Sequence, residues 1–231
     1  MRCAPVSVPA RRSELRSSVK DRGMEGRASL MLVHGAGSGP WVFEGWADAF
    51  PGMTVVAVDL HDGLDIPCAS MHDYARSLIK AAPGLPTPLF VCGWSMGGLV
   101  ALMASATLEP AGLILLEPSP SAELQGVDPS QELRPGAFDP QVVYGPFPGG
   151  IQSRPESQLA RDERKRGISV PSISRPCLVV WGDEFAIDRG KGVADLYSAE
   201  ALSFPGVDHW DLVLNADVRD AVRRWITSKL R

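Results

Sequence analysis

Residues 89–103 join a short apolar run, a serine between glycines, and a second apolar run of helix-forming residues. This pattern predicts a buried strand, a sharp turn and a buried helix. Gly93-Trp94-Ser95-Met96-Gly97 fits G-x-S-x-G, a pattern typical of a serine held at a strained corner between strand and helix. A Cβ at either glycine would press on the neighbouring strand or helix. Because such a pattern also arises by chance, it indicates a functional serine only if the rest of the chain supplies residues that can act with it.

Composition restricts the classes of protein to consider. The 231 residues suit one domain, and 45% hydrophobic with 22% charged residues is ordinary for a soluble globular chain. The formal net charge of −4 argues against a nucleic-acid partner. No apolar segment is long enough to span a bilayer, and none follows Arg11-Arg12 as a signal-peptide core. We therefore expect no membrane association and a cytoplasmic location.

The four cysteines are widely spaced and show no metal-binding pair. Cys92 and Cys177 lie in apolar, strand-like runs and are predicted to be small buried hydrophobic residues. Reduced thiols fit the expected cytoplasmic location, and the sequence predicts neither a metal nor a cofactor.

Apolar runs alternate with helical patterns, which predicts an α/β fold whose mostly parallel sheet carries helices on both faces. Residues 1–27 are polar and lack periodicity, so they are predicted to be disordered, with the folded domain over 28–231. Ligands of such sheets bind beyond the carboxyl ends of the strands, where Gly35, Ser95 and Glu117 fall. The predicted strands are 29–33, 54–58, 89–92, 113–116, 177–181 and 201–204, and the helices are 41–50, 70–82, 96–103, 189–197 and 217–230.

Residues 119–176 interrupt this alternation and are rich in proline and glycine. An insertion of this length inside a compact domain is usually functional, so we expect a lid over a site. Its charged segment 156–166 is predicted to be a helix with a solvated face.

From about Ser29 to its end, the chain resembles the α/β-hydrolase superfamily. The glycine-rich loop 34–41 resembles that of the plant methylesterase and hydroxynitrile lyase branch. The resemblance implies that Ser95 is a nucleophile and that the backbone N–H groups of Ala36 and Met96 form an oxyanion hole. It also implies that the lid insertion follows the sixth strand, in the family's count of strands.

A serine hydroxyl needs an adjacent base to take its proton, and the base needs a third group to orient it. In this fold the chain order is serine, acid, histidine, and His209 is the one histidine that satisfies it. His34 is expected to brace the glycine loop, whereas His61 and His72 are expected to be a loop residue and a helix-surface residue.

The acid departs from the family pattern, since Phe185 occupies the position of the usual aspartate. Three carboxylates can substitute. Glu184 is one residue early, close to its placement in the methylesterase branch, and we favour it. Glu117 matches the acid position of other members such as haloalkane dehalogenases, and Asp183 is the third candidate.

These residues predict a cofactor-free serine hydrolase that cleaves a small carboxylic ester or thioester through an acyl-enzyme. An acyltransferase with the same triad and a receptor-like relative with little turnover are the alternatives. Ser95 excludes the aspartate nucleophile of dehalogenases and epoxide hydrolases, and Gly35 and Trp210 replace two residues typical of the lyases. Trp94 and Trp210 are the expected substrate-binding residues, with Trp41, Phe138, Tyr144 and Phe147 as further candidates or as core. The oligomeric state stays open.

Overall fold

The computed structural model describes residue 26 and residues 28–231, so the predicted disorder of the N-terminal segment falls almost entirely outside the described residues. The main sheet has six strands in the order β2-β1-β3-β4-β7-β8, and every pairing between them is parallel. The strands are β1 (Ser29–Val33), β2 (Thr54–Val58), β3 (Leu89–Trp94), β4 (Gly112–Leu116), β7 (Cys177–Trp181) and β8 (Glu200–Ser203).

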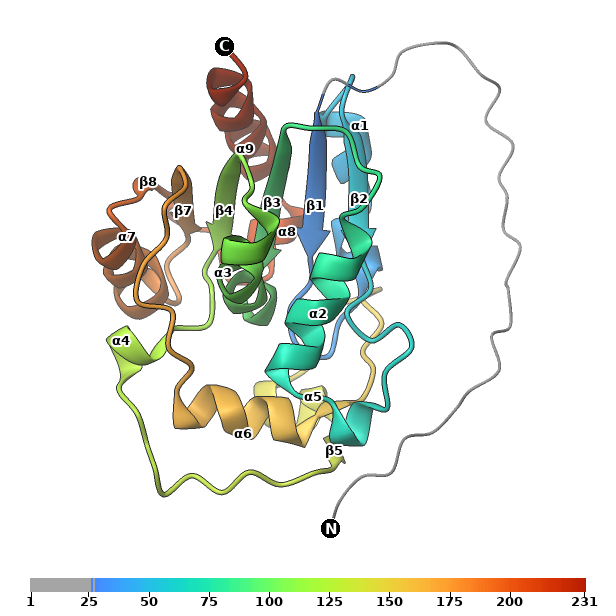
Figure 1. Cartoon of the computed structure of the whole chain (residues 1–231), viewed down its shortest axis with the longest axis vertical. Coiled ribbons are helices and arrows are strands. Elements are labelled where there is room, and N and C mark those ends of the chain that lie inside the picture. The colour runs from blue at the N-terminus through green and yellow to red at the C-terminus, as the bar shows by residue number, and fades with distance from the viewer. Residues whose placement is uncertain (1–25, 27) are drawn as a thin grey trace.

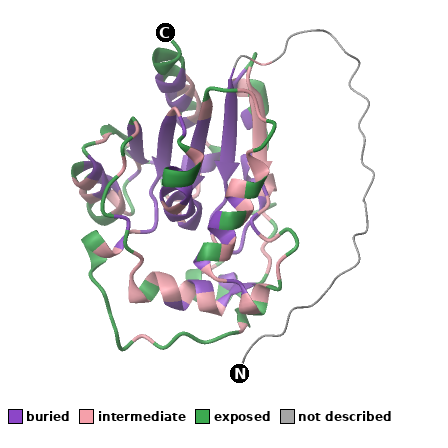
Figure 2. Cartoon of the chain, in the orientation of Figure 1, coloured by how far each residue is buried: buried purple, intermediate pink, exposed green. Residues whose placement is uncertain are grey.

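The central strands are buried on both faces, as Figure 2 shows. Successive side chains of a strand point to opposite faces, so Met31 and Val33 of β1 join one apolar core while Leu30 and Leu32 join the other. Continuous apolar strands of this kind need helices on both sides, and the fold provides them. This confirms the predicted α/β architecture.

Helices cover the two faces of the sheet (Figure 1). α2 (Met71–Ala81), α3 (Met96–Leu108) and α7 (Gly192–Tyr197) pack on one face, and α1 (Trp46–Ala49), α8 (Asp211–Leu214) and α9 (Ala216–Lys229) pack on the other. α2 begins at a capping box in which the Ser70 and Asp73 side chains each accept a hydrogen bond from the other residue's backbone N–H. The helix therefore begins where the sequence predicted it, within one residue.

Two expected helices differ from the prediction. Residues 41–50 form a 3-10 turn (Pro40–Phe43) followed by the short α1, because Gly45, with φ of 76°, breaks the helix between them. α7 is preceded by a π-helical turn (Ala186–Lys191). Along this chain the insertion follows β4, the fourth strand of the main sheet.

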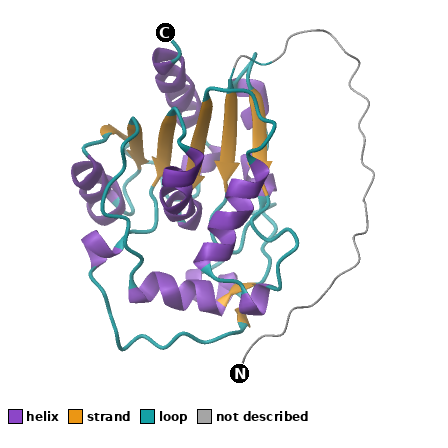
Figure 3. Ribbon diagram, in the orientation of Figure 1, coloured by secondary structure: helices purple, strands orange, loops and turns teal. Residues whose placement is uncertain are grey.

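The insertion between β4 and β7 contains α4 (Ala122–Gln125), β5 (Ala137–Phe138), α5 (Pro140–Tyr144), β6 (Glu156–Ser157) and α6 (Gln158–Arg166). β5 and β6 pair antiparallel as a separate small sheet. Figures 1 and 3 show α6 and its neighbours, joined by long loops, beyond the carboxyl ends of the main strands. The insertion therefore lies on the side where parallel sheets bind ligands.

Cys92 and Cys177 are buried free cysteines, as predicted, and burial raises the pKa of the Cys177 thiol to about 12. Cys68 is disulfide-bonded, so the expectation of reduced thiols is wrong for this residue. None of the helices over the described residues has the length and apolar character needed to cross a membrane.

Candidate active site

Ser95 occupies the corner between β3 and α3 with φ of 55° and ψ of −122°, a conformation that L-residues rarely adopt. Its flanking glycines make the corner possible. A Cβ at Gly93 would lie 2.4 Å from the Gly97 carbonyl oxygen, and one at Gly97 would lie 2.2 Å from the Val33 carbonyl oxygen. The strained turn that the G-x-S-x-G pattern predicted is therefore present, and its glycines are sterically required.

His209 pairs with Glu117. The Nδ1–H of His209 donates to Oε2 of Glu117 over 2.6 Å, and Oε1 of Glu117 accepts from the Gly182 N–H over 2.8 Å. Glu117 is fully buried at the end of β4, where its positive φ of 40° turns the chain. Since a carboxylate only accepts, this contact places the proton of a neutral His209 on Nδ1 and leaves Nε2 as a possible base.

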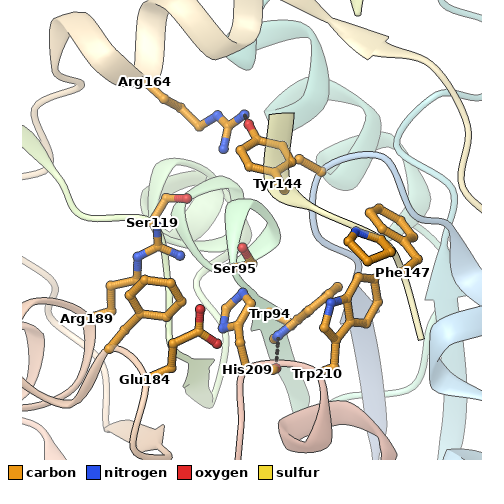
Figure 4. A pocket seen from close by; sticks show the side chains of 13 residues that line it. Trp94, Ser95, Ser119, Tyr144, Phe147, Arg164, Glu184, Arg189, His209 and Trp210 are labelled. Carbon is orange, nitrogen blue, oxygen red and sulfur yellow. Dashed lines mark hydrogen bonds between the residues drawn. The ribbon is translucent and has the colours of Figure 1, made fainter. Parts of the chain in front are cut away.

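The other two candidate acids lie elsewhere. Asp183 accepts a hydrogen bond from the Gly206 N–H over 2.8 Å, so it braces the loop after β8. Glu184 lines the cavity beside Ser95 (Figure 4), but among the described residues it makes no hydrogen bond with His209. The contact expected of Glu184 is made instead by Glu117.

Ser95 and His209 line one cavity of about 290 Å³, and Figure 4 shows the serine side chain next to the imidazole ring. In the part of the chain that is described, no hydrogen bond yet joins Ser95 Oγ to Nε2 of His209. Such contacts are often long in proteins without substrate and tighten when it binds. The geometry therefore allows His209 to serve as the base for Ser95.

Trp94 and Trp210 lie on the cavity wall, as predicted. Trp94 also holds the His209 loop, because its indole N–H donates to the His209 carbonyl oxygen over 2.9 Å (Figure 4). Its ring centroid lies 5.0 Å from that of His209 and 4.7 Å from that of Trp210. Phe147, from the insertion, packs on Trp210 at 4.6 Å and closes one side of the cavity.

The two expected oxyanion donors have free N–H groups. Ala36 lines the cavity, and Met96 is the first residue of α3, directly after Ser95. Over the described residues, neither N–H donates to another backbone or side-chain group. His34, just before the loop, is buried and donates from Nδ1 to the Gly35 carbonyl oxygen over 2.9 Å. It braces this loop, as expected.

Glu156 of the insertion is hydrogen-bonded to the glycine-rich loop 34–41, and no sequence pattern pointed to this residue. This fully buried carboxylate accepts hydrogen bonds from the Gly37 N–H over 2.8 Å, from the Ser157 N–H over 2.9 Å and from the Tyr74 hydroxyl. His61 Nε2 lies 3.4 Å from Oε2. Burial opposes ionisation, but these neighbours outweigh it and lower the pKa of Glu156 to about 2.

Arg154 adds a second link to the same loop. Its guanidinium donates to the Ser38 carbonyl oxygen over 2.8 Å, to Asp59 over 3.0 and 2.5 Å, and to His34 Nε2 over 3.1 Å. Burial works against ionisation of Asp59, yet His34 and Arg154 keep the pKa of this carboxyl far below its usual range. A carboxylate and a guanidinium from the insertion thus hold the loop that carries Ala36.

Tyr144, a predicted candidate for the pocket, and Phe185, at the position of the usual aspartate, also lie on the cavity wall. Ser119, Arg164 and Arg189 line it as well and were not predicted to. The density of basic residues in 161–166 was the one signal for Arg164. No cluster of three or more His, Cys, Asp or Glu side chains suited to a metal ion occurs among the residues with described positions.

A parallel sheet with a serine at the strand–helix corner and a carboxylate-paired histidine after the last strand defines a fold of the α/β-hydrolase type. The family model described as "Alpha/beta hydrolase family" matches residues 30–225. The chain belongs to this family.

Curated relatives match over a shorter stretch. A pimeloyl-[acyl-carrier protein] methyl ester esterase of Neisseria meningitidis is 35% identical over 97 residues, and one of Aromatoleum aromaticum is 38% identical over 79 residues. These stretches span 42% and 33% of this chain and 30% of each relative.

Solved structures extend the similarity across the fold. ClbQ from the colibactin NRPS/PKS pathway superimposes with a TM-score of 0.63 at 16% identity, over 88% of this chain and 98% of its own. Polyneuridine aldehyde esterase gives 0.61 at 16% identity, over 87% and 99%. The RedJ thioesterase of Streptomyces coelicolor gives 0.60 at 17% identity, over 95% and 100%. At these identities the likeness establishes the fold.

Proposed function

We propose that this protein is a serine hydrolase that cleaves a carboxylic ester or thioester, using Ser95, His209 and Glu117. The observation that carries the proposal is the 2.6 Å contact of His209, which lines the cavity that holds Ser95, with the fully buried Glu117. The names of the curated relatives, methyl ester esterases, support this class of substrate.

In the first half of the reaction, Ser95 Oγ attacks the carbonyl carbon while His209 Nε2 takes the hydroxyl proton. Glu117 keeps the imidazole in the required tautomer and stabilises the imidazolium that forms. The N–H groups of Ala36 and Met96 donate to the oxyanion, and such donors typically contribute about 3–4 kcal/mol. His209 then passes the proton to the leaving alcohol or thiol, and the acyl group remains on Ser95.

In the second half, water replaces the leaving group. His209 takes a proton from water as its oxygen attacks the acyl carbon, and then returns that proton to Ser95 Oγ, which releases the acid. These reaction steps need no cofactor. The proposed binding partner is the substrate, a small ester or thioester. The cytoplasmic location stays a prediction.

An organophosphonate tests the proposal directly, since it phosphonylates only an activated serine. We expect intact-mass measurement to show one adduct on the wild type and none on Ser95→Ala. We also expect ester hydrolysis by Ser95→Ala to fall by a factor on the order of 10⁶. An unmodified wild type, or equal labelling of both proteins, would show that Ser95 is not the nucleophile.

A further inference from the structure

The cavity at Ser95 adjoins a second cavity lined by four basic side chains. Ser119, Tyr144, Arg164 and Arg189 line both cavities, and the second one adds Arg161 and Lys165. No acidic residue lines this second cavity within the described structure.

The acidic residues of α6 are engaged away from this charge. Asp162 pairs with Arg134, with Nε–Oδ2 at 3.1 Å, and Glu163 accepts a hydrogen bond from the Met71 N–H over 2.7 Å. None of the four basic residues of the second cavity has an ion-pair partner within 4.0 Å in the described part of the chain. Their charge is therefore available to a ligand.

Arg164 has a buried donor group without a partner. Its Nε is buried without a hydrogen-bond partner, and its one donated side-chain contact is a 3.3 Å bond from Nη2 to the Tyr144 hydroxyl. Figure 4 shows it on the far side of the cavity, above Ser95. A guanidinium carries five N–H donors, so most of its capacity is unused here.

Arg189 faces the same space from the π-helical turn. Its guanidinium carbon lies 4.0 Å from the Phe185 ring centroid, and both residues line the cavity. Burial first, and the charge of Arg164 second, lower the pKa of Arg189, while the charges of Glu117 and Glu184 act in the opposite direction without outweighing them. Two cations that share a partly buried wall destabilise each other, and an anion between them would relieve this repulsion.

We propose that Arg164 and Arg189 bind an anionic group, a carboxylate or phosphate, on the ester or thioester that Ser95 attacks. This inference rests on the proposed function and narrows its substrate class. Guanidinium groups bind both anions through paired, charge-assisted hydrogen bonds. The anion can belong to the acyl part or to the leaving group, and paired substrates separate these two sources.

Two pairs of substrates differ mainly in charge. Monomethyl adipate carries a carboxylate in its acyl part, and methyl adipamate is its neutral amide analogue. S-butyryl-4′-phosphopantetheine carries its charge in the leaving group, and S-butyryl-pantetheine is its neutral counterpart. We expect kcat/KM to favour the charged member of one pair by about tenfold or more, as charge-assisted hydrogen bonds allow. The favoured pair identifies the side that carries the anion.

Arginine variants link this preference to the site. Arg164→Gln and Arg189→Gln should each lower the charged-to-neutral ratio of kcat/KM by about tenfold. Arg166→Gln is the matched control, because Arg166 belongs to the same helix but lines neither of the two cavities. It should keep the wild-type ratio. Wild type without a charge preference, or arginine variants that keep it, would overturn the inference while leaving the proposed function intact.

A binding measurement covers the case in which no ester is hydrolysed. Calorimetric titration of Ser95→Ala with adipate and with inorganic phosphate should detect binding of one anion, and Arg189→Gln in that background should weaken it about tenfold. Binding without hydrolysis by the wild type would refute the proposed function and keep the anion site. Equal affinities in both proteins, or no binding of either anion, would refute the site.

Discussion

Two fully buried glutamates, Glu117 and Glu156, each lie beside a histidine, yet they occupy different settings. Glu117 Oε2 is 2.6 Å from His209 Nδ1, and Glu156 Oε2 is 3.4 Å from His61 Nε2. His209 stands on the wall of the serine cavity with 14% of its side chain exposed, whereas His61 has 7% exposed.

The donors around the two carboxylates differ as well. Glu117 accepts one backbone N–H and directs its other oxygen at His209. Glu156 accepts two backbone N–H groups and the Tyr74 hydroxyl, and the His61 ring stacks on Tyr74 with centroids 5.5 Å apart. A histidine–carboxylate pair can orient a catalytic base only where the second imidazole nitrogen faces a reacting group, as we propose for His209. Elsewhere the same pair holds the fold together.

Replacing Glu117 should have the largest effect on activity. Glu117→Gln keeps the shape but offers an amide to His209 Nδ1, so the imidazole loses the partner that fixes its tautomer. We expect kcat to fall by a factor on the order of 10³–10⁴, measured by steady-state hydrolysis of a reactive ester. Glu184→Gln, the matched change at the same cavity, should cost less than about tenfold. A larger loss for Glu184→Gln than for Glu117→Gln would assign the orienting role to Glu184.

In contrast to Glu117→Gln, Glu156→Gln should affect the stability of the fold more than the rate of hydrolysis. It removes the charge that three donors and His61 surround, so we expect the free energy of unfolding to fall by about 2–3 kcal/mol. The kcat should drop by about tenfold, because Gly37 loses part of its anchor next to Ala36. Chemical denaturation and ester hydrolysis measure the two effects. Unchanged stability would show that the network around Glu156 contributes little.

Because its pKa is depressed, Glu156 should contribute to the free energy of unfolding in a way that depends on pH. A carboxyl group with a folded pKa of about 2 stabilises the fold above its unfolded pKa, near 4.3, and this contribution disappears as the pH falls through 2. The difference of about two units corresponds to roughly 3 kcal/mol. Denaturation at several pH values between 5 and 2 should show a steep loss for the wild type. Glu156→Gln should give a shallower slope, and identical slopes would contradict this account.

Much of the fold and part of the site follow from sequence. Continuous apolar strands between helical segments predicted the parallel sheet, and the glycines around Ser95 predicted its corner. The chain order indicated His209. The choice between Glu117 and Glu184 did not follow, because it depends on how β4 and β7 lie side by side. The Glu117 N–H bonds to the Val180 carbonyl oxygen, which fixes where this carboxylate points.

Glu156 was harder to predict, for a related reason. It lies 119 residues from Gly37 along the chain, within an insertion whose course no strand or helix pattern dictates. Glu156 was predicted to begin a charged helix with a solvated face, whereas Glu156 and Ser157 form β6 and the helix begins at Gln158. Its burial becomes visible only once the β5–β6 pairing brings the insertion back over the glycine loop.

Replacing Asp183, the third candidate acid, should have the smallest effect on activity. It is exposed and accepts one hydrogen bond, from the Gly206 N–H, and it does not line the serine cavity. Asp183→Ala should therefore lower the free energy of unfolding by about 0.5–1 kcal/mol and change kcat by less than tenfold. Because Asp183 and Glu184 are adjacent, equal and small effects at both would place the orienting carboxylate on β4 rather than after β7. A loss of a hundredfold or more for Asp183→Ala would instead mean that the loop after β7 rearranges to bring this carboxylate to His209.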